Sequence, residues 1–186
     1  MQFISGNSAS LRSEVMTGVA NYRHRVFVEK LGWQLQCEEG VEYDQFDRAD
    51  TQYVVAQDNS QQIIGTARLL PTLHPYLLGD VFPQLMNGLP VPDSEDVWEL
   101  SRFAALDFNA PATSAMAQFS SPIAVGLLRA SLEQAARLGA KKLITVSPLG
   151  VERLLRKAGF RAHRAGPPMV VDGSPIFACW IDVDHV

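Results

Sequence analysis

Residues 52–70 read QYVVAQDNSQQIIGTARLL, and this stretch decides the fold. The runs 52–57 and 62–70 are rich in apolar and β-branched residues, whereas the DNSQ sequence between them is typical of a turn. The pattern therefore predicts a β-hairpin. Arg68 interrupts the second run, and a charge inside an apolar strand persists only where it is paired or faces a cleft.

Helical and strand-like segments lie on both sides of this hairpin. Before it, we expect a helix over residues 11–31 that ends at Gly32. Apolar residues recur there at the three-and-four spacing of an amphipathic helix: Leu11, Val15, Val19, Tyr22 and Val26. After the hairpin we expect a short helix within residues 77–86 and a strand at residues 97–106, VWELSRFAAL, which carries polar side chains inward.

The C-terminal half alternates helices and strands. Ser121 and Pro122 favour the start of a helix that runs to residue 138 and ends at Gly139. A buried strand at 142–147, a helix at 150–158 closed by Gly159, and strands at 169–171 and 176–183 follow. This order predicts a mixed sheet with helices on its faces, an α/β or α+β fold, in a single domain of residues 1–186.

Composition excludes several classes of protein. The chain is 47% hydrophobic and 19% charged, which is typical of a globular protein with a sizeable core. Its net charge of −4 argues against a protein that binds nucleic acid or membranes through overall charge. Cys37 and Cys179 lack the neighbours of a zinc site, and no apolar run approaches the roughly 20 residues that span a bilayer. The N-terminus lacks a secretory pattern, so we expect a cytoplasmic protein. Because the cysteines lack further ligands, we expect no bound metal.

Two groups of side chains near the N-terminus could bind a ligand. Arg23 and Phe27 lie one helical turn apart and Trp33 follows the helix, a combination that can stack on a purine or sulfonium and hold a carboxylate. Taken alone, such aromatic residues are more often part of the core. Residues 42–47, EYDQFD, hold three carboxylates that could bind an amine, a sulfonium or a hard metal, although a solvated loop is the commoner meaning.

Charges inside the predicted strands are stronger candidates. Glu99, Ser101 and Arg102 interrupt VWELSRFAAL, and a desolvated Glu99 beside an amine could accept its proton. A structural ion-pair network is an equally good interpretation. Residues 129–164 hold nine Lys or Arg against two Glu, which suggests an acidic or phosphorylated partner, with simple solvation of helix surfaces as the alternative.

In order and spacing, these residues together resemble the acyl-homoserine-lactone synthases, the LuxI-type autoinducer synthases. The likeness extends through TVSPLGVERLLRKAGF at residues 145–160 and covers all eight of the family's characteristic polar and aromatic positions: Arg23, Phe27, Trp33, Asp44, Asp47, Arg68, Glu99 and Arg102. Each element is weak by itself, whereas the ordered set is specific. The resemblance implies a GNAT-like N-acyltransferase fold, with a mixed twisted sheet that opens to admit a pantetheine arm.

The resemblance also implies a reaction. S-adenosylmethionine and an acyl chain carried by acyl-carrier protein would be the substrates, and an acyl-homoserine-lactone quorum-sensing signal and methylthioadenosine would be the products. S-adenosylmethionine is consumed, so no cofactor is implied. Residues 118–126 do not match the pyrophosphate loop of many coenzyme A acetyltransferases, which argues against ordinary coenzyme A dependence.

Roles for individual residues follow from the same resemblance. Glu99 is the first choice as the base that deprotonates the methionine amine, and Asp44 is the second. A backbone N–H near Phe103 would stabilise the thioester oxyanion. The remaining substrate-binding residues would form the S-adenosylmethionine pocket, balance its amine and sulfonium, or bind its carboxylate and hold the acids: Arg23, Phe27, Trp33, Asp47, Arg68, Ser101 and Arg102.

The C-terminal half would hold the acyl chain and the carrier protein. The acyl pocket would comprise Leu100, Leu143, Thr145, Val146, Ser147, Leu155 and Phe160. Thr145 matches a position that in this family often accompanies a 3-oxo acyl group, although Thr is also a common strand residue. The acidic carrier would dock on basic side chains: Lys141, Lys142, Arg153, Arg156 and Lys157.

Two other functions remain open. One is a coenzyme A-dependent GNAT acyltransferase that acts on another amine and releases no methylthioadenosine. The other is a non-catalytic module that binds acyl-carrier protein or S-adenosylmethionine without turnover.

Overall fold

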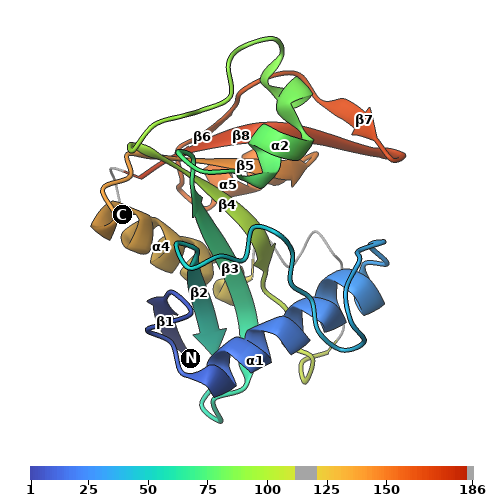
Figure 1. Cartoon of the computed structure of the whole chain (residues 1–186), viewed down its shortest axis with the longest axis vertical. Coiled ribbons are helices and arrows are strands. Elements are labelled where there is room, and N and C mark those ends of the chain that lie inside the picture. Colours follow the sequence, from blue (N-terminus) through green and yellow to red (C-terminus); the bar gives the residue numbers. More distant parts are fainter. Residues whose placement is uncertain (112–120, 184–186) are drawn as a thin grey trace. The chain divides into compact units, whose positions relative to one another are not determined.

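The computed structural model describes residues 1–111 and 121–183 (Figure 1). Residues 118–120 of the segment compared with the pyrophosphate loop lie outside the described residues. The chain divides into two compact units, Met1–Arg68 with Arg102–Ala130, and Leu69–Ser101 with the chain from Ser131 onward. Strands β3 (Ile63–Pro71) and β4 (Val97–Ala104) contribute to both units.

The predicted hairpin lies in the first unit and is confirmed. Strand β2 (Gln52–Gln57) is the neighbour of β3, and the Asp58 carboxylate closes the turn by accepting the N–H groups of Ser60 at 2.8 Å and Gln62 at 2.9 Å. On its other side β2 pairs antiparallel with β1 (Gln2–Gly6), a strand that the sequence analysis did not predict.

The helix predicted at residues 11–31 has the right extent but two different geometries. Residues Ser13–Arg23 form the α-helix α1, and His24–Lys30 continue it as a π-helix, η1. The wider turns are visible at the end of η1, where the N–H of Leu31 bonds the carbonyl of Val26, five residues earlier, at 2.9 Å.

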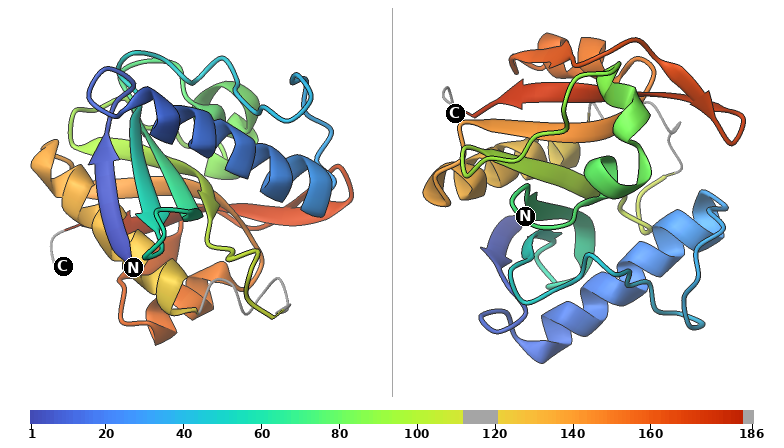
Figure 2. Two further views of the ribbon diagram at one scale, coloured as in Figure 1. Left: turned by 90° about the horizontal axis from the view of Figure 1, so that it is seen from below. Right: turned by 45° about the horizontal axis from the view of Figure 1, so that its top comes forward.

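Helix α1 lies across one face of β1, β2 and β3 (Figures 1 and 2). Its buried residues Val15 and Val19 pack against Tyr53 and Val55 of β2. A second apolar cluster continues along the helix with Tyr22, Val26 and Phe27 against Ala104 and Leu106. This packing buries one face of the helix and fixes the direction in which Arg23 points.

The second unit contains the C-terminal strands and three helical segments. Strand β5 pairs parallel with β4 and antiparallel with β8, and β8 in turn pairs with β6 and β7 (Figure 2). The bounds are β5 Lys142–Pro148, β6 Ala162–Arg164, β7 Met169–Val171, β8 Ser174–Asp182, α2 Leu77–Val81, the 3-10 helix η2 Pro83–Met86 and α5 Val151–Lys157. Helix α4, Pro122–Arg137, passes from the first unit into the second.

The predicted helix ends and strands in this half are confirmed, except for β6, which was not predicted. Gly139 after α4 and Gly159 after α5 adopt φ values of +88° and +91°, the left-handed conformation that ends helices. The ladder between β4 and β5 joins Val97–Glu99 to Lys142–Ile144, whereas β5 stays paired with β8 as far as Pro148. The mixed sheet flanked by helices is therefore the predicted fold class.

Candidate functional site

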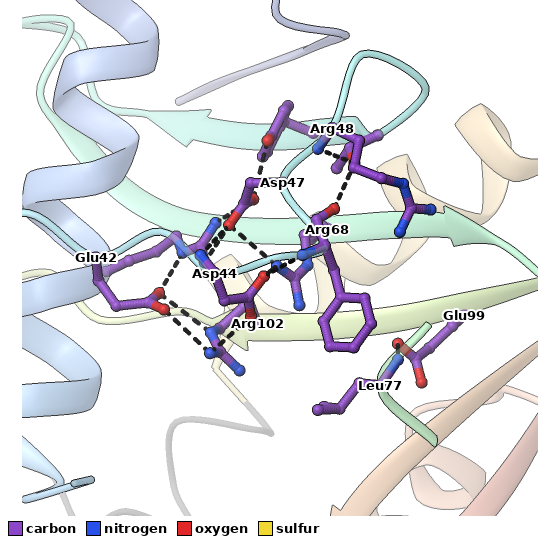
Figure 3. Close-up of polar contacts among 12 residues, drawn as sticks. Glu42, Asp44, Asp47, Arg48, Arg68, Leu77, Glu99 and Arg102 are labelled. Atoms are coloured by element: carbon purple, nitrogen blue, oxygen red, sulfur yellow. Dashed lines mark hydrogen bonds and ion pairs between the residues drawn. The ribbon is translucent and has the colours of Figure 1, made fainter. Parts of the chain in front are cut away.

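A cluster of three arginines and three acids lies inside the first unit (Figure 3). Its members come from α1, from the segment before β2, from β3 and from β4: Arg23, Glu42, Asp44, Asp47, Arg68 and Arg102. Their side chains are 0 to 15% exposed. Buried charges are costly unless they are paired, and here every one of these side chains has an ionic partner.

Glu42 joins two of the arginines. Its Oε2 accepts hydrogen bonds from Arg23 Nε at 2.6 Å and Arg102 Nε at 3.1 Å, and its Oε1 accepts one from Arg102 Nη2 at 3.0 Å. Burial alone would raise the pKa of Glu42, but the hydrogen bonds and charges of the two arginines outweigh it and lower that pKa. Glu42 belongs to the acidic run seen in the sequence but was not among the predicted site residues.

Asp47 is fully occupied by donors. Its Oδ1 accepts from Arg23 Nη1 at 2.8 Å and from the Tyr53 hydroxyl at 2.9 Å. Its Oδ2 accepts from Arg23 Nη2, from Arg68 Nη1 and from the backbone N–H of Asp44. Burial opposes ionisation, but the Arg23 and Arg68 charges and these bonds hold the pKa of Asp47 well below its usual range.

Asp44 is the most accessible carboxylate of the cluster, with a side chain 15% exposed against 5% for Asp47 and 1% for Glu42. It pairs with Arg68 Nη1 at 2.5 Å and with Arg102 Nη2 at 3.0 Å. Together with Glu42 it lines an open hollow of about 490 Å³, whose other lining residues are Leu35, Gln36, Tyr43 and Gln45. Asp44 can therefore reach a ligand from within the cluster.

The predicted aromatic pair is assembled at the end of η1. The rings of Phe27 and Trp33 stack with their centroids 4.7 Å apart, and the backbone N–H of Trp33 donates to the Phe27 carbonyl at 2.9 Å. The guanidinium of Arg102 lies 5.6 Å and 5.7 Å from the two ring centroids, so the cation beside these rings is Arg102. Trp33 is 43% exposed, which leaves ring surface available to a ligand.

Arg102 itself has an unusual backbone. Its φ is +50°, a left-handed conformation inside a strand that favours glycine over other residues. A non-glycine residue persists there only when its surroundings hold it, and the two carboxylates and two rings around its guanidinium do so.

Glu99 lies in the second unit and holds the start of α2. Its side chain is buried, and its two oxygens accept the backbone N–H groups of Leu77 at 3.0 Å and Leu78 at 2.6 Å (Figure 3). Backbone donors of this kind stabilise a carboxylate in its ionised form. Ser101 is also buried, and Phe103 is half-buried on the part of β4 that belongs to the first unit.

The predicted acyl-pocket residues do not all share one face. Leu143, Thr145 and Ser147 alternate with Ile144 and Val146 along β5, so Val146 points away from Thr145. Leu100 and Leu155 are buried as well, and Phe160 is half-buried. The Thr145 hydroxyl lies at the outer limit of a hydrogen bond, 3.5 Å from the Val146 carbonyl.

The predicted carrier-protein residues are all exposed but lie on two faces of the β5–β8 sheet. Lys142 lies over the Trp180 ring, on the face opposite to Phe177. Helix α5 lies on the Phe177 face, because its Glu152 pairs at 2.9 Å with Arg164, whose guanidinium covers the Phe177 ring. Lys142 on β5 and the α5 residues Arg153, Arg156 and Lys157 therefore form two separate basic surfaces.

Within residues 1–111 and 121–183, no helix is long and apolar enough to cross a membrane. No group of three or more His, Cys, Asp or Glu side chains in these ranges is arranged to hold a metal ion.

The chain is similar to known autoinducer synthases along nearly its whole length. A family model described as autoinducer synthase matches residues 8–186. The acyl-homoserine-lactone synthase of Acinetobacter nosocomialis is 56% identical over 183 residues, which are 98% of this chain and 100% of that protein.

Solved structures extend the likeness to three dimensions. TofI, solved in a ternary complex with an inhibitor and MTA, has a TM-score of 0.84 at 45% identity and covers 99% of this chain and 92% of its own. BjaI, a CoA-dependent acyl-homoserine lactone synthase solved with SAM and isopentyl-CoA, has a TM-score of 0.82 at 25% identity, with coverages of 98% and 82%. A Lactobacillus plantarum structure described as an N-acetyltransferase, at 19% identity and a TM-score of 0.64, shows the fold alone.

Proposed function

We infer that this chain, which belongs to the autoinducer synthase family and is an acyl-homoserine-lactone synthase, acylates S-adenosylmethionine with a fatty acyl group carried by acyl-carrier protein. The deprotonated methionine amine attacks the thioester carbonyl and releases the carrier thiol. The methionine carboxylate then displaces methylthioadenosine from the carbon that bears the sulfonium, which closes the lactone. Because the second attack is intramolecular, holding the substrate in one orientation favours it strongly.

The observation that carries the S-adenosylmethionine part of this proposal is the buried cluster around Asp44. S-adenosylmethionine brings an amine, a carboxylate and a sulfonium, and the cluster offers anionic carboxylates and cationic guanidinium groups beside a stacked aromatic pair. Asp44 balances the cationic groups, Arg102 and Arg68 bind the carboxylate, and the exposed Trp33 ring packs on the planar or sulfonium part. TofI bound to MTA and BjaI bound to SAM support this assignment.

Glu99 is our first choice as the base and Asp44 the second. The experiment is mass spectrometry of organic extracts from bacteria that express the wild type, Glu99→Gln or Asp44→Asn, followed by kinetics on the purified proteins. We expect Glu99→Gln to lower kcat by about 100-fold or more with little change in the KM of S-adenosylmethionine. We expect Asp44→Asn mainly to raise that KM. The reverse pattern in two folded variants would exchange the roles.

The acyl donor is tested separately, because BjaI shows that a related enzyme can use coenzyme A. The same acyl chain is offered to the purified protein on acyl-carrier protein and on coenzyme A, and release of methylthioadenosine is measured. We expect kcat/KM to be higher with the carrier protein. A higher value with coenzyme A would contradict this part of the proposal and favour the coenzyme A-dependent alternative.

We also propose that Thr145 favours a 3-oxo acyl group through a hydrogen bond from its hydroxyl. Its side chain is buried on the β5 face shared with Leu143, and the hydrogen bond from its hydroxyl to the Val146 carbonyl is long, at 3.5 Å. Thr145→Ala is expected to lower the preference for 3-oxo over unsubstituted acyl donors by about threefold to tenfold while turnover persists. Thr145→Ser is the matched control and should keep the preference; equal preference in all three proteins would refute the role.

A further inference from the structure

We propose that Tyr53, which lies on β2 and outside the residues predicted from sequence, is a positioning residue for S-adenosylmethionine. Its hydroxyl orients Asp47, and Asp47 in turn fixes Arg23, Arg68 and the backbone of Asp44. This inference rests on the proposed function, because it assigns these groups to the amino-acid end of that substrate.

The Tyr53 ring is held rigidly. It is 2% exposed and packs in the apolar cluster that contains Val15, Val19 and Val55. In the strand register Tyr53 lies opposite Gly6 of β1, so its backbone is fixed from a second side. A rigid ring places its hydroxyl at one point, 2.9 Å from Asp47 Oδ1.

The hydroxyl is a donor throughout the working pH range. Burial and the negative charge of Asp47 both raise the pKa of Tyr53, so the proton stays on the phenol oxygen. Asp47 can only accept when ionised, and its own pKa lies well below its usual range. The direction of this hydrogen bond is therefore fixed from Tyr53 to Asp47.

Asp47 acts on the substrate through its neighbours. With two donors on Oδ1, three on Oδ2 and a side chain only 5% exposed, it has no room for a ligand. Arg68 Nη1 bonds both Asp47 and Asp44, so the position of Asp47 is passed to the carboxylate that lines the hollow. Without the tyrosine hydroxyl, Oδ1 keeps Arg23 Nη1 as its one donor among the contacts described above, so Asp47 is held less strictly on that side and its position relative to Arg23 and Arg68 can shift.

The experiment compares Tyr53→Phe with Tyr22→Phe. Tyr22 is a matched control because it is also buried, at 4% exposure, but its hydroxyl bonds main-chain atoms of Ile64 and Leu106. Both variants lose one buried oxygen and keep the ring. Binding of S-adenosylmethionine and of methylthioadenosine, which lacks the amino-acid end, is measured by calorimetry at a temperature at which circular dichroism shows all proteins folded.

We expect Tyr53→Phe to weaken S-adenosylmethionine binding by about threefold to tenfold and to leave methylthioadenosine binding unchanged. Tyr22→Phe should change neither. Unchanged S-adenosylmethionine binding in Tyr53→Phe, or equal loss for both ligands, would overturn the positioning role. Wild-type protein that binds methylthioadenosine but not S-adenosylmethionine would overturn the proposed function itself, and the positioning role with it.

Discussion

At the scale of single residues, Glu42 shows how ionisation and stability are linked in the cluster. Its carboxylate receives three hydrogen bonds from Arg23 and Arg102 and is almost completely buried. Protonation would remove that charge from between two buried guanidinium groups. The folded state therefore holds Glu42 ionised to a lower pH than the unfolded state does.

The stability of the protein should consequently fall in acid. Because the folded-state pKa values of Glu42 and Asp47 lie below the ordinary values of 4.5 and 3.8, the unfolded state binds more protons as the pH drops through this region. The free energy of unfolding should be largest above about pH 5 and decline below it.

Glu42→Gln tests the contribution of that carboxylate. We expect the variant to lose roughly 3 kcal/mol at pH 7, because two buried arginines lose a charged partner, and to show a shallower decline in acid. Urea unfolding of both proteins across the pH range measures this. Parallel curves for the variant and the wild type would mean that Glu42 does not titrate with folding.

Individual residues of the site could be chosen from the sequence because the chemistry of buried charge is restrictive. Arg68 and Arg102 stood out as charges within apolar strands, and both are buried and paired. Glu42 and Tyr53 could not be chosen in the same way. An acid in a run of acids and a tyrosine in a strand are ordinary, and only the three-dimensional pairing with Arg102 and Asp47 distinguishes them.

Among the helices and strands, the long N-terminal helix shows what the spacing of apolar residues can and cannot predict. Its extent was predictable from apolar spacing, but the change to a π-helix after Arg23 was not. Tyr22 and Val26 are four residues apart, a spacing that one α-turn and the wider π-turn both accommodate with a buried face. Strands β1 (QFISG) and β6 (AHR) escaped prediction because they hold few apolar or β-branched residues, whereas β7 (MVV), which is as short as β6, consists of them.

Helix ends were easier to predict, and one of them makes a clean test. Gly139 has φ +88°, and a Cβ added there would meet nothing within 4 Å. Gly139→Ala therefore changes only backbone strain, and we expect it to destabilise the protein by about 1 kcal/mol. Chemical denaturation measures the loss, and steady-state kinetics at 25 °C should match the wild type. A variant as stable as the wild type would contradict the left-handed conformation.

At the scale of the whole molecule, charge is distributed unevenly. The chain carries −4 overall, yet residues 129–164 hold nine Lys or Arg against two Glu. In the second unit Lys142 and helix α5 present these cations on opposite faces of the β5–β8 sheet. The distribution of Lys and Arg along the sequence could not reveal that they lie on two faces, because this depends on the direction in which the side chains of β5 point.

Under the proposed function, we expect acyl-carrier protein to bind the α5 face, which carries Arg153, Arg156 and Lys157 on one short helix. Arg153→Glu with Lys157→Glu should raise the KM for acyl-carrier protein by about tenfold and weaken its dependence on salt. The control is Lys142→Glu on the other face, which should have a smaller effect. A larger effect of Lys142→Glu would assign the carrier to that face.

The balance of three guanidinium groups against three carboxylates also constrains how this protein can change over evolutionary time or in a design project. Each of the six side chains has two ionic partners, so a single replacement leaves two opposite charges in the interior with one partner each, and compensated pairs of replacements should cost less stability than single ones. Trp33 and Tyr43, at 43% and 39% exposure, carry no such obligation. Libraries aimed at new amine substrates should therefore diversify these aromatic positions and leave the cluster of three arginines and three acids unchanged.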